Sequence, residues 1–190
     1  MTICLEKNLK LSGSLTKDKC EILSITRKKH PVTYPYQLHG QHLKHCDYAK
    51  YLGITISKDM RWTRHIDTIT AKANSKLGFV KRNININNRA VKAQAYKSLV
   101  RPVLEYGQAV WDPYTASDTE QLELVQCRAA RFTMNGYRRT SSVGAMLAEL
   151  NWESLASRRR TARLVLFHKI HYGLVAINMP LEFKYNSGPT

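Results

Sequence analysis

Apolar and polar residues alternate with a period of two in the first third of the chain, in short runs separated by turn residues. Cys20–Thr26 alternates well enough to form a strand. Two further runs flank Gly40-Gln41, a spacing typical of a tight hairpin. Another strand is expected at about Tyr51–Ser57, where β-branched and aromatic residues concentrate. These runs predict a small antiparallel sheet over residues 20–57.

From Trp62 the hydrophobic period becomes that of an α-helix. Apolar residues recur at steps of three and four and form one continuous stripe, which predicts a long amphipathic helix. The stripe consists of Trp62, Ile66, Ile69, Ala73, Leu77 and Val80. Ser57 and Asp59 precede the helix and offer side-chain oxygens for a turn and an N-cap.

The second predicted helix runs from about Arg89 towards Trp111, with Asn88 as its N-cap. Pro102 lies inside it and has no amide hydrogen to donate. A kink or break is therefore expected near Val100.

Three more helices are predicted in the remainder of the chain. The first starts at Ser117 or Asp118 and ends at Asn135-Gly136. A short helix follows, capped by Ser141 or Ser142, and a last long helix opens at Trp152-Glu153. The expected buried stripes are Leu122, Val125, Ala129 and Phe132, then Leu155, Leu164, Phe167 and Ile170. The chain is thus predicted to be α+β, with a small antiparallel sheet followed by a mainly helical bundle of about five helices.

The net charge of +16 favours a polyanionic partner. Residues 61–111 carry 10 Lys and Arg against two acidic residues, which is half of the whole excess. Lys72 and Lys76 are four residues apart and share one face of the predicted long helix. Nucleic acid is the favoured partner, and an anionic membrane surface is the main alternative.

Composition indicates the cellular compartment in which the protein works. No apolar run approaches the ~20 residues that span a bilayer, and no secretory signal is visible. The four cysteines are scattered without a Cys-x-x-Cys pair, which is typical of a reducing compartment. We expect an intracellular protein of the nucleus or cytoplasm that is not secreted, with no membrane partner, small-molecule substrate or metal site. Oligomeric state stays open.

One run, Lys50–Ile66, resembles the segment that follows the catalytic core in reverse transcriptases of non-LTR (LINE-like) retrotransposons. The similarity continues in the same order through Ala71–Phe79, Gln94–Tyr106, Ala109–Pro113, Val125–Phe132 and Leu155–Arg160. It covers roughly residues 20 to 180. The resemblance implies the end of a palm with a primer-grip-like hairpin in residues 1–60 and thumb-like helices in 61–134. A C-terminal helical region in 135–180 and a tail in 181–190 would follow.

The same resemblance suggests which residues contact a template–primer duplex, either an RNA–DNA hybrid or another double strand. Tyr51, Leu52 and Gly53 match the primer grip, and glycine there allows a strand backbone to approach a sugar-phosphate. The alternative is a strand glycine packed beneath a helix. On the thumb helix the candidate contacts are Arg61, Arg64, Lys72, Lys76 and Arg82. The alternative for these is a solvated helix face. Arg89, Lys92, Lys97 and Arg101 would extend the basic surface.

Catalytic residues are expected to be absent. In the intact family, adjacent aspartates in a Phe/Tyr-Ala-Asp-Asp turn hold two Mg²⁺ ions for nucleotidyl transfer. The six aspartates of this chain include no adjacent pair. Residues Lys10-Leu11 and Lys19–Glu21 match the segment after that turn, although Ser12–Lys17 departs from the pattern. We therefore expect a cofactor-free fragment that does not polymerise alone.

Arg158–Arg160 and Arg163 form a dense basic cluster in the last helix. The cluster could bind nucleic acid or serve as a nuclear import signal. It could also be neutralised by Glu149 and Glu153, and a solvated or bridged surface is favoured. Two other functions stay open for the whole chain. One is a domesticated or standalone basic module that binds nucleic acid or a protein, and the other is a non-functional product of a degenerate element.

Overall fold

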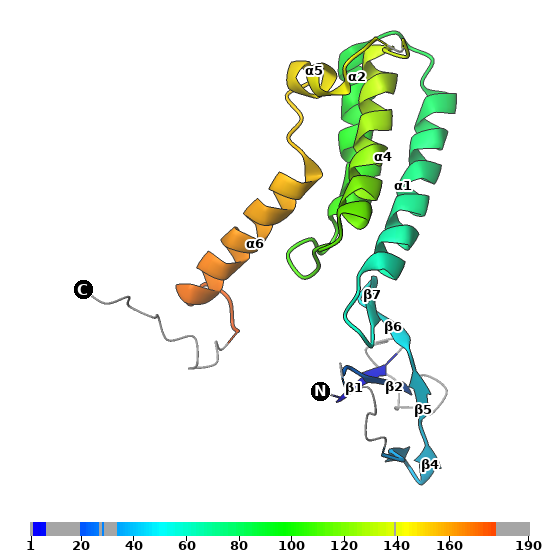
Figure 1. Cartoon of the computed structure of the whole chain (residues 1–190), viewed down its shortest axis with the longest axis vertical. Helices are drawn as coiled ribbons and strands as arrows, with labels where there is room; N and C mark the ends of the chain where they lie inside the picture. Colours follow the sequence, from blue (N-terminus) through cyan, green and yellow to red (C-terminus); the bar gives the residue numbers. More distant parts are fainter. Residues whose placement is uncertain (1, 7–19, 27, 29–33, 139, 178–190) are drawn as a thin grey trace, which may run out of the picture.

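A computed structural model describes residues 2–6, 20–26, 28, 34–138 and 140–177. The strands gather at one end of an elongated molecule and the helices at the other, which confirms the α+β class (Figure 1). The helices are α1 (Thr63–Asn83), α2 (Arg89–Ala95), the π-helical turn η2 (Tyr96–Val100), α3 (Arg101–Glu105), α4 (Ala116–Met134), α5 (Val143–Glu149) and α6 (Leu155–His171). The predicted match at Lys10-Leu11 and Lys19 and the tail 181–190 lie outside the described residues.

The described strands form three small sheets rather than the single antiparallel sheet that was predicted. Strands β1 (Thr2–Glu6), β2 (Cys20–Ser24) and β5 (Lys44–Cys46) make one, β3 (Gln37–Leu38) and β4 (Gln41–His42) a second, and β6 (Tyr48–Tyr51) and β7 (Ile54–Ser57) a third. Strand β5 pairs parallel to β2. The β3–β4 hairpin lies between these two strands in the sequence and forms part of the connection that parallel pairing requires. The predicted hairpin is present, but its turn is His39-Gly40 and not Gly40-Gln41, because Gln41 pairs with Leu38 as part of β4.

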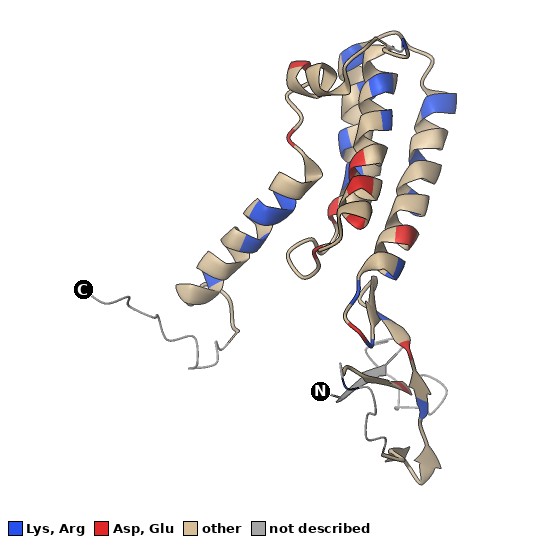
Figure 2. Cartoon of the chain, in the orientation of Figure 1, with Lys and Arg blue, Asp and Glu red and all other residues tan. Residues whose placement is uncertain are grey.

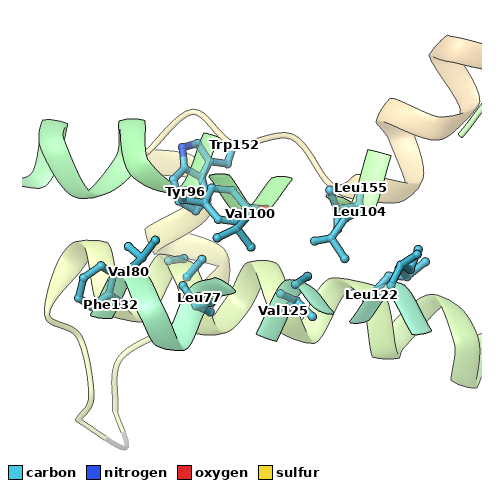
Figure 3. Close-up of a cluster of buried hydrophobic side chains, with 14 of the residues drawn as sticks. Leu77, Val80, Tyr96, Val100, Leu104, Leu122, Val125, Phe132, Trp152 and Leu155 are labelled. Carbon is cyan, nitrogen blue, oxygen red and sulfur yellow. The ribbon is translucent and has the colours of Figure 1, made fainter. Parts of the chain in front are cut away.

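The helical core lies where α1 packs against α4 and against the continuous α2–η2–α3 segment (Figure 3). The predicted apolar stripes of α1 and α4 are buried there, except that Trp62 is only partly covered. Main contributors are Leu77, Val80, Tyr96, Val100, Leu104, Leu122, Val125, Phe132, Trp152 and Leu155. Periodic burial of apolar area on both helices therefore holds α1 in place.

Several helix ends lie where local chemistry predicts them. The Asn88 side chain accepts hydrogen bonds from the amides of Ala90 and Val91 and caps α2. Pro102 is the second residue of α3, two positions after η2 ends, so the missing amide hydrogen lies next to a wider helical turn. Asn135 has a φ of 53° and ends α4 in the left-handed conformation.

Other caps differ from the prediction by one to three residues. Thr115 caps α4 by accepting from the amide of Asp118, where Ser117 or Asp118 was expected. Asp59 accepts from the amide of Arg61 and so belongs to the turn before α1, not to its cap. Thr115 was missed because Ser and Asp are stronger N-cap residues than Thr, so the sequence alone favours Ser117 or Asp118.

Helix α6 departs from the bundle instead of lying along it (Figure 1). Leu155 and Arg159 are its buried residues, and the side chains of Leu164 and Phe167 are exposed. The predicted buried stripe is therefore wrong at Leu164 and Phe167, because α6 leaves the bundle there, while Ile170 is partly buried. Its N-cap is Ser154, while Trp152 belongs to the core.

Candidate nucleic-acid interface

The hairpin β6–β7 presents the Tyr51-Leu52-Gly53 run at its tip. Tyr51 pairs with Ile54, so Leu52 and Gly53 form a two-residue turn. Both have positive φ, 46° and 84°, as in the mirror-image turns that match strand twist. The sequence placed Gly53 inside a strand, and the structure corrects this to a turn. Glycine is needed here for its backbone conformation, since L-residues rarely adopt such angles.

Tyr106, just beyond α3, holds this tip against the helices. Its hydroxyl donates to the Leu52 carbonyl oxygen at 2.9 Å. A Cβ on Gly53 would lie 3.1 Å from the Tyr106 ring, and a Cβ on Gly107 would lie 2.7 Å from the Ile54 side chain. Both glycines therefore allow the close approach of the hairpin to the end of α3.

A buried histidine connects the same hairpin to α1. The backbone amide of Thr55 donates to Nδ1 of His65, 3.3 Å away. The imidazole packs edge-on against Trp111, with ring centroids 5.0 Å apart. Burial lowers the pKa of His65, because the charged ring would lose its hydration. A neutral ring that accepts at Nδ1 carries its proton on Nε2, which has no hydrogen-bond partner among the described residues.

The tip, α1 and α3 enclose a cavity of about 430 Å³. Gly53 and Tyr106 line it from the hairpin side, and Thr68 and Lys72 line it from α1. Ile69, Pro102 and Val103 add apolar surface, while Lys50 and Lys72 are the charged residues around it. The cavity thus combines an apolar floor with positive charge, which suits a sugar-phosphate unit.

Three predicted cations extend from this cavity along α1. Lys72, Lys76 and Arg82 are exposed, and none makes an ion pair within the described part of the chain. Phe79 lies three residues beyond Lys76 and shares its face, with 56% of its surface exposed. This flank therefore offers unpaired positive charge beside an exposed aromatic ring.

Arg61 and Arg64, the other two predicted cations, lie in a more mixed environment. They line a second hollow of about 730 Å³, which also includes Asp59 and Asp67. Arg61 approaches Asp59 at 3.5 Å, and the Arg64 guanidinium stacks over the Tyr48 ring. Thr68 lines both hollows, so they adjoin along α1. Positive charge is consequently unopposed at the Lys72 end and partly balanced at the Arg61 end.

The structure does not bring the second-helix cations to this surface. Lys92 was predicted to be exposed, but it is buried, and its Nζ donates to the Asn135 side chain at 2.8 Å. Arg89 pairs with Glu149 and Arg101 with Glu105. Glu149 of α5 and Asn135 at the end of α4 are distant in the sequence, so helical periodicity does not reveal them, whereas Arg101 and Glu105 are four residues apart within α3. Figure 2 shows that basic residues occur on several helices, while acidic ones gather near the start of α4.

The arginine cluster of α6 is bridged, as one interpretation had it, but by other acids than those expected. Arg158 bonds Glu105, and Arg159 and Arg163 both bond Asp112 at 3.3 and 2.7 Å. Glu149 and Glu153 are occupied by Arg89 and Ser157. The cluster therefore attaches α6 to Glu105 at the end of α3 and to Asp112 in the segment between α3 and α4.

Sequence reasoning missed Tyr106, Gly107 and His65 as parts of the site. Tyr106 ends the run Gln94–Tyr106 that carries the family resemblance, which was a usable signal for its importance. Among the described residues no group of three or more His, Cys, Asp or Glu side chains is placed to hold a metal ion. None of the described helices is long and apolar enough to cross a bilayer.

Two curated relatives are similar to this chain. A probable RNA-directed DNA polymerase from transposon BS of Drosophila melanogaster is 29% identical over 127 residues, which are 65% of this chain and 14% of the relative. The RNA-directed DNA polymerase from mobile element jockey, of the same organism, is 29% identical over 97 residues, or 50% and 11%. No model of a protein family matches the chain, and no solved structure does. The chain is therefore similar to a part of RNA-directed DNA polymerases from mobile elements.

Proposed function

We propose that this chain is the duplex-holding portion of a non-LTR retrotransposon reverse transcriptase. In this proposal residues 1–60 end the palm, 61–134 form the thumb and 135–180 form the helical region beyond it. The matched stretches make up 14% and 11% of the relatives, so polymerase activity as a whole belongs to a longer protein. The role of this chain is to grip the template–primer double strand.

One observation supports the proposal most strongly. Gly53 of the hairpin tip and Lys72 of α1 are 19 positions apart in the sequence, yet they line the same cavity. Both were singled out as duplex contacts from separate motifs, the Tyr51-Leu52-Gly53 run and the basic helix. A strand glycine buried beneath a helix, the alternative for Gly53, would not be exposed at a hairpin tip.

The geometry suggests how the double strand is held. One strand passes the tip, where Lys50 and Lys72 neutralise phosphates and the apolar floor accepts a sugar. Lys76 and Arg82 continue along the exposed flank of α1, and the small residues Ala71 and Ser75 allow the duplex to come close. Contacts of this kind fix position on the backbone without reading base sequence.

This chain supplies no catalytic group in the proposal. Nucleotidyl transfer in the intact family uses Mg²⁺ held by adjacent aspartates, and this sequence has no such pair. The purified chain is accordingly expected to bind a primed template without extending it. Incorporation of dNTPs by the chain with Mg²⁺ would overturn this part of the proposal.

The test is a matched pair of charge reversals. Binding of a fluorescent RNA–DNA hybrid is measured by anisotropy over a salt series for Lys72→Glu/Lys76→Glu and for Lys44→Glu/Lys169→Glu. All four lysines are exposed, and both variants change net charge equally. The first pair should weaken binding by on the order of tenfold or more and reduce the salt slope by about two, one per lost phosphate contact.

The control variant Lys44→Glu/Lys169→Glu should keep the salt dependence of the wild type, and its affinity for the hybrid should stay within about a factor of ten. Equal losses in both variants would indicate non-specific attraction by a basic protein, as expected of a standalone basic module. No hybrid binding by the wild-type chain would leave the duplex-holding role without support.

A further inference from the structure

A third cavity, separate from the two hollows along α1, lies away from the hairpin, where the chain turns from α5 into α6. Its volume is about 510 Å³, and the residues that line it come from η2, α3 and the α5–α6 segment. Three cations converge on it from three elements: Lys97, Arg101 and Arg158. None of the residues of the proposed duplex surface lines this cavity.

The positive charge of this cavity is only partly balanced. Arg101 and Arg158 both contact the carboxylate of Glu105, so one negative charge serves two guanidinium groups. Glu153 is the acid on the wall, and its carboxylate accepts from the Ser157 hydroxyl. Lys97 makes no ion pair within the described residues. The cavity therefore has a net positive charge, and the two guanidinium groups are already held in place.

The side chain of Trp152 also lines the cavity. Trp152 is 7% exposed, and its indole Nε1 has no partner in the described part of the chain. The ring stacks on Tyr96, with centroids 4.4 Å apart. Figure 3 shows its nitrogen on the edge away from Leu77 and Val125. The Nε1 atom itself is inaccessible to a ligand in the cavity, so Trp152 reports binding through its place in the wall and does not donate to the anion.

We propose that this cavity is a phosphate-binding pocket. Arginine forks and a lysine suit the tetrahedral, multiply charged phosphate group, and Asn151 lies beside them in the cavity wall. Three cations against the two carboxylates of Glu105 and Glu153 leave one positive charge in excess, and the guanidinium forks match the geometry of phosphate oxygens. The group comes either from a free phosphoanion or from a second nucleic-acid strand away from the duplex surface.

Binding to the cavity can be followed by NMR through the indole N–H signals, because the chain has only three tryptophans and Trp152 lines the cavity. The ¹⁵N-labelled full chain is titrated with sodium pyrophosphate, with oligothymidylate, and with sodium chloride at matched ionic strength. Trp152→Phe identifies the Trp152 signal. That signal should shift saturably with pyrophosphate if the ligand is a free phosphoanion, and with oligothymidylate alone if the ligand is a strand.

Lys97→Glu removes a cation that holds no other part of the protein, so the fold should survive. It should weaken the response by roughly tenfold or more, as expected for loss of a charge-assisted contact. The signals of Trp62 and Trp111 report whether the fold is intact. Lys72→Glu/Lys76→Glu should leave the response unchanged, which separates this pocket from the duplex surface. No saturable shift with either phosphate probe, or an unchanged response in Lys97→Glu, would overturn the proposal.

Discussion

Helices α1 and α6 both have many basic residues but use them in opposite ways. On the cavity flank of α1, Lys72 and Lys76 are exposed and meet no acid within the described residues. On α6, Arg158, Arg159 and Arg163 are all bonded to carboxylates. Two helices with a similar number of basic residues thus differ in function: lysines of α1 remain unpaired on the described surface, while three arginines of α6 hold that helix to the rest of the protein.

The acids opposite each helix account for this difference. The first turns of α6 face Glu105 at the end of α3 and Asp112 in the segment after it, so three arginines of α6 are used in holding the helix. The cavity flank of α1 faces the apolar Pro102 and Val103 instead. A basic helix is therefore a candidate for phosphate binding only where the structure leaves its charge unpaired.

The largest expected effect concerns the attachment of α6. Arg159→Ala should lower the free energy of unfolding by about 3 kcal/mol, because a buried guanidinium and its packing on Trp111 are lost and Asp112 loses a partner. Urea denaturation measures the change. Arg160→Ala, an exposed neighbour, should change stability by less than about 0.5 kcal/mol. Equal effects of the two substitutions would contradict the attachment role.

A smaller effect is expected at the hairpin tip. Gly53→Ala forces an L-residue to a φ of 84° and brings its Cβ to 3.1 Å from Tyr106, so it should cost roughly 2 kcal/mol. Gly40→Ala is the matched control, since Gly40 has a φ of 74° but nothing within 4 Å. The difference between the two variants in thermal unfolding isolates the Tyr106 contact. No difference would mean that the tip is not held against the helices.

The smallest effect is a pH dependence from His65, which links the hairpin to α1. Its pKa is lowered in the folded state, so the unfolded chain binds more protons below the ordinary value of 6.5. The contribution of His65 to the free energy of unfolding should be fully present above that pH. It should decrease as the pH falls, by up to about 1.4 kcal/mol per pH unit. Melting temperatures between pH 7.5 and 5.5 should show a steeper decline for the wild type than for His65→Gln. Parallel declines would exclude His65 as the source.

Local signals predicted much of the helical fold. The stripe from Ile66 to Val80, the Asn88 cap and the irregular turn before Pro102 depend on neighbours along the chain, and each is confirmed. Which helix faces are buried in the outer part of the molecule depends instead on packing partners far away in the sequence. Leu164 is apolar and correctly spaced, yet it is exposed because α6 leaves the bundle.

The candidate site shows the same limit. Exposed positions for Lys72 and Lys76 follow from helical period, whereas the burial of Lys92 requires Asn135, 43 residues away. Gly53 was singled out from the sequence as a strand residue, but its turn conformation depends on the two-residue link between β6 and β7. The hydrogen bond from Tyr106 to Leu52 spans 54 residues and has no local signature.

Photocrosslinking compares the two basic helices most directly. Phe79 on α1 and Phe167 on α6 are 56% and 52% exposed, so either can be replaced by p-benzoylphenylalanine with little disturbance. Each variant is irradiated with a labelled RNA–DNA hybrid at moderate salt. If the duplex lies along α1, the crosslink should form from position 79 and be weak or missing from position 167. Equal crosslinking from both positions, or crosslinking from 167 alone, would contradict the assignment of the duplex to α1.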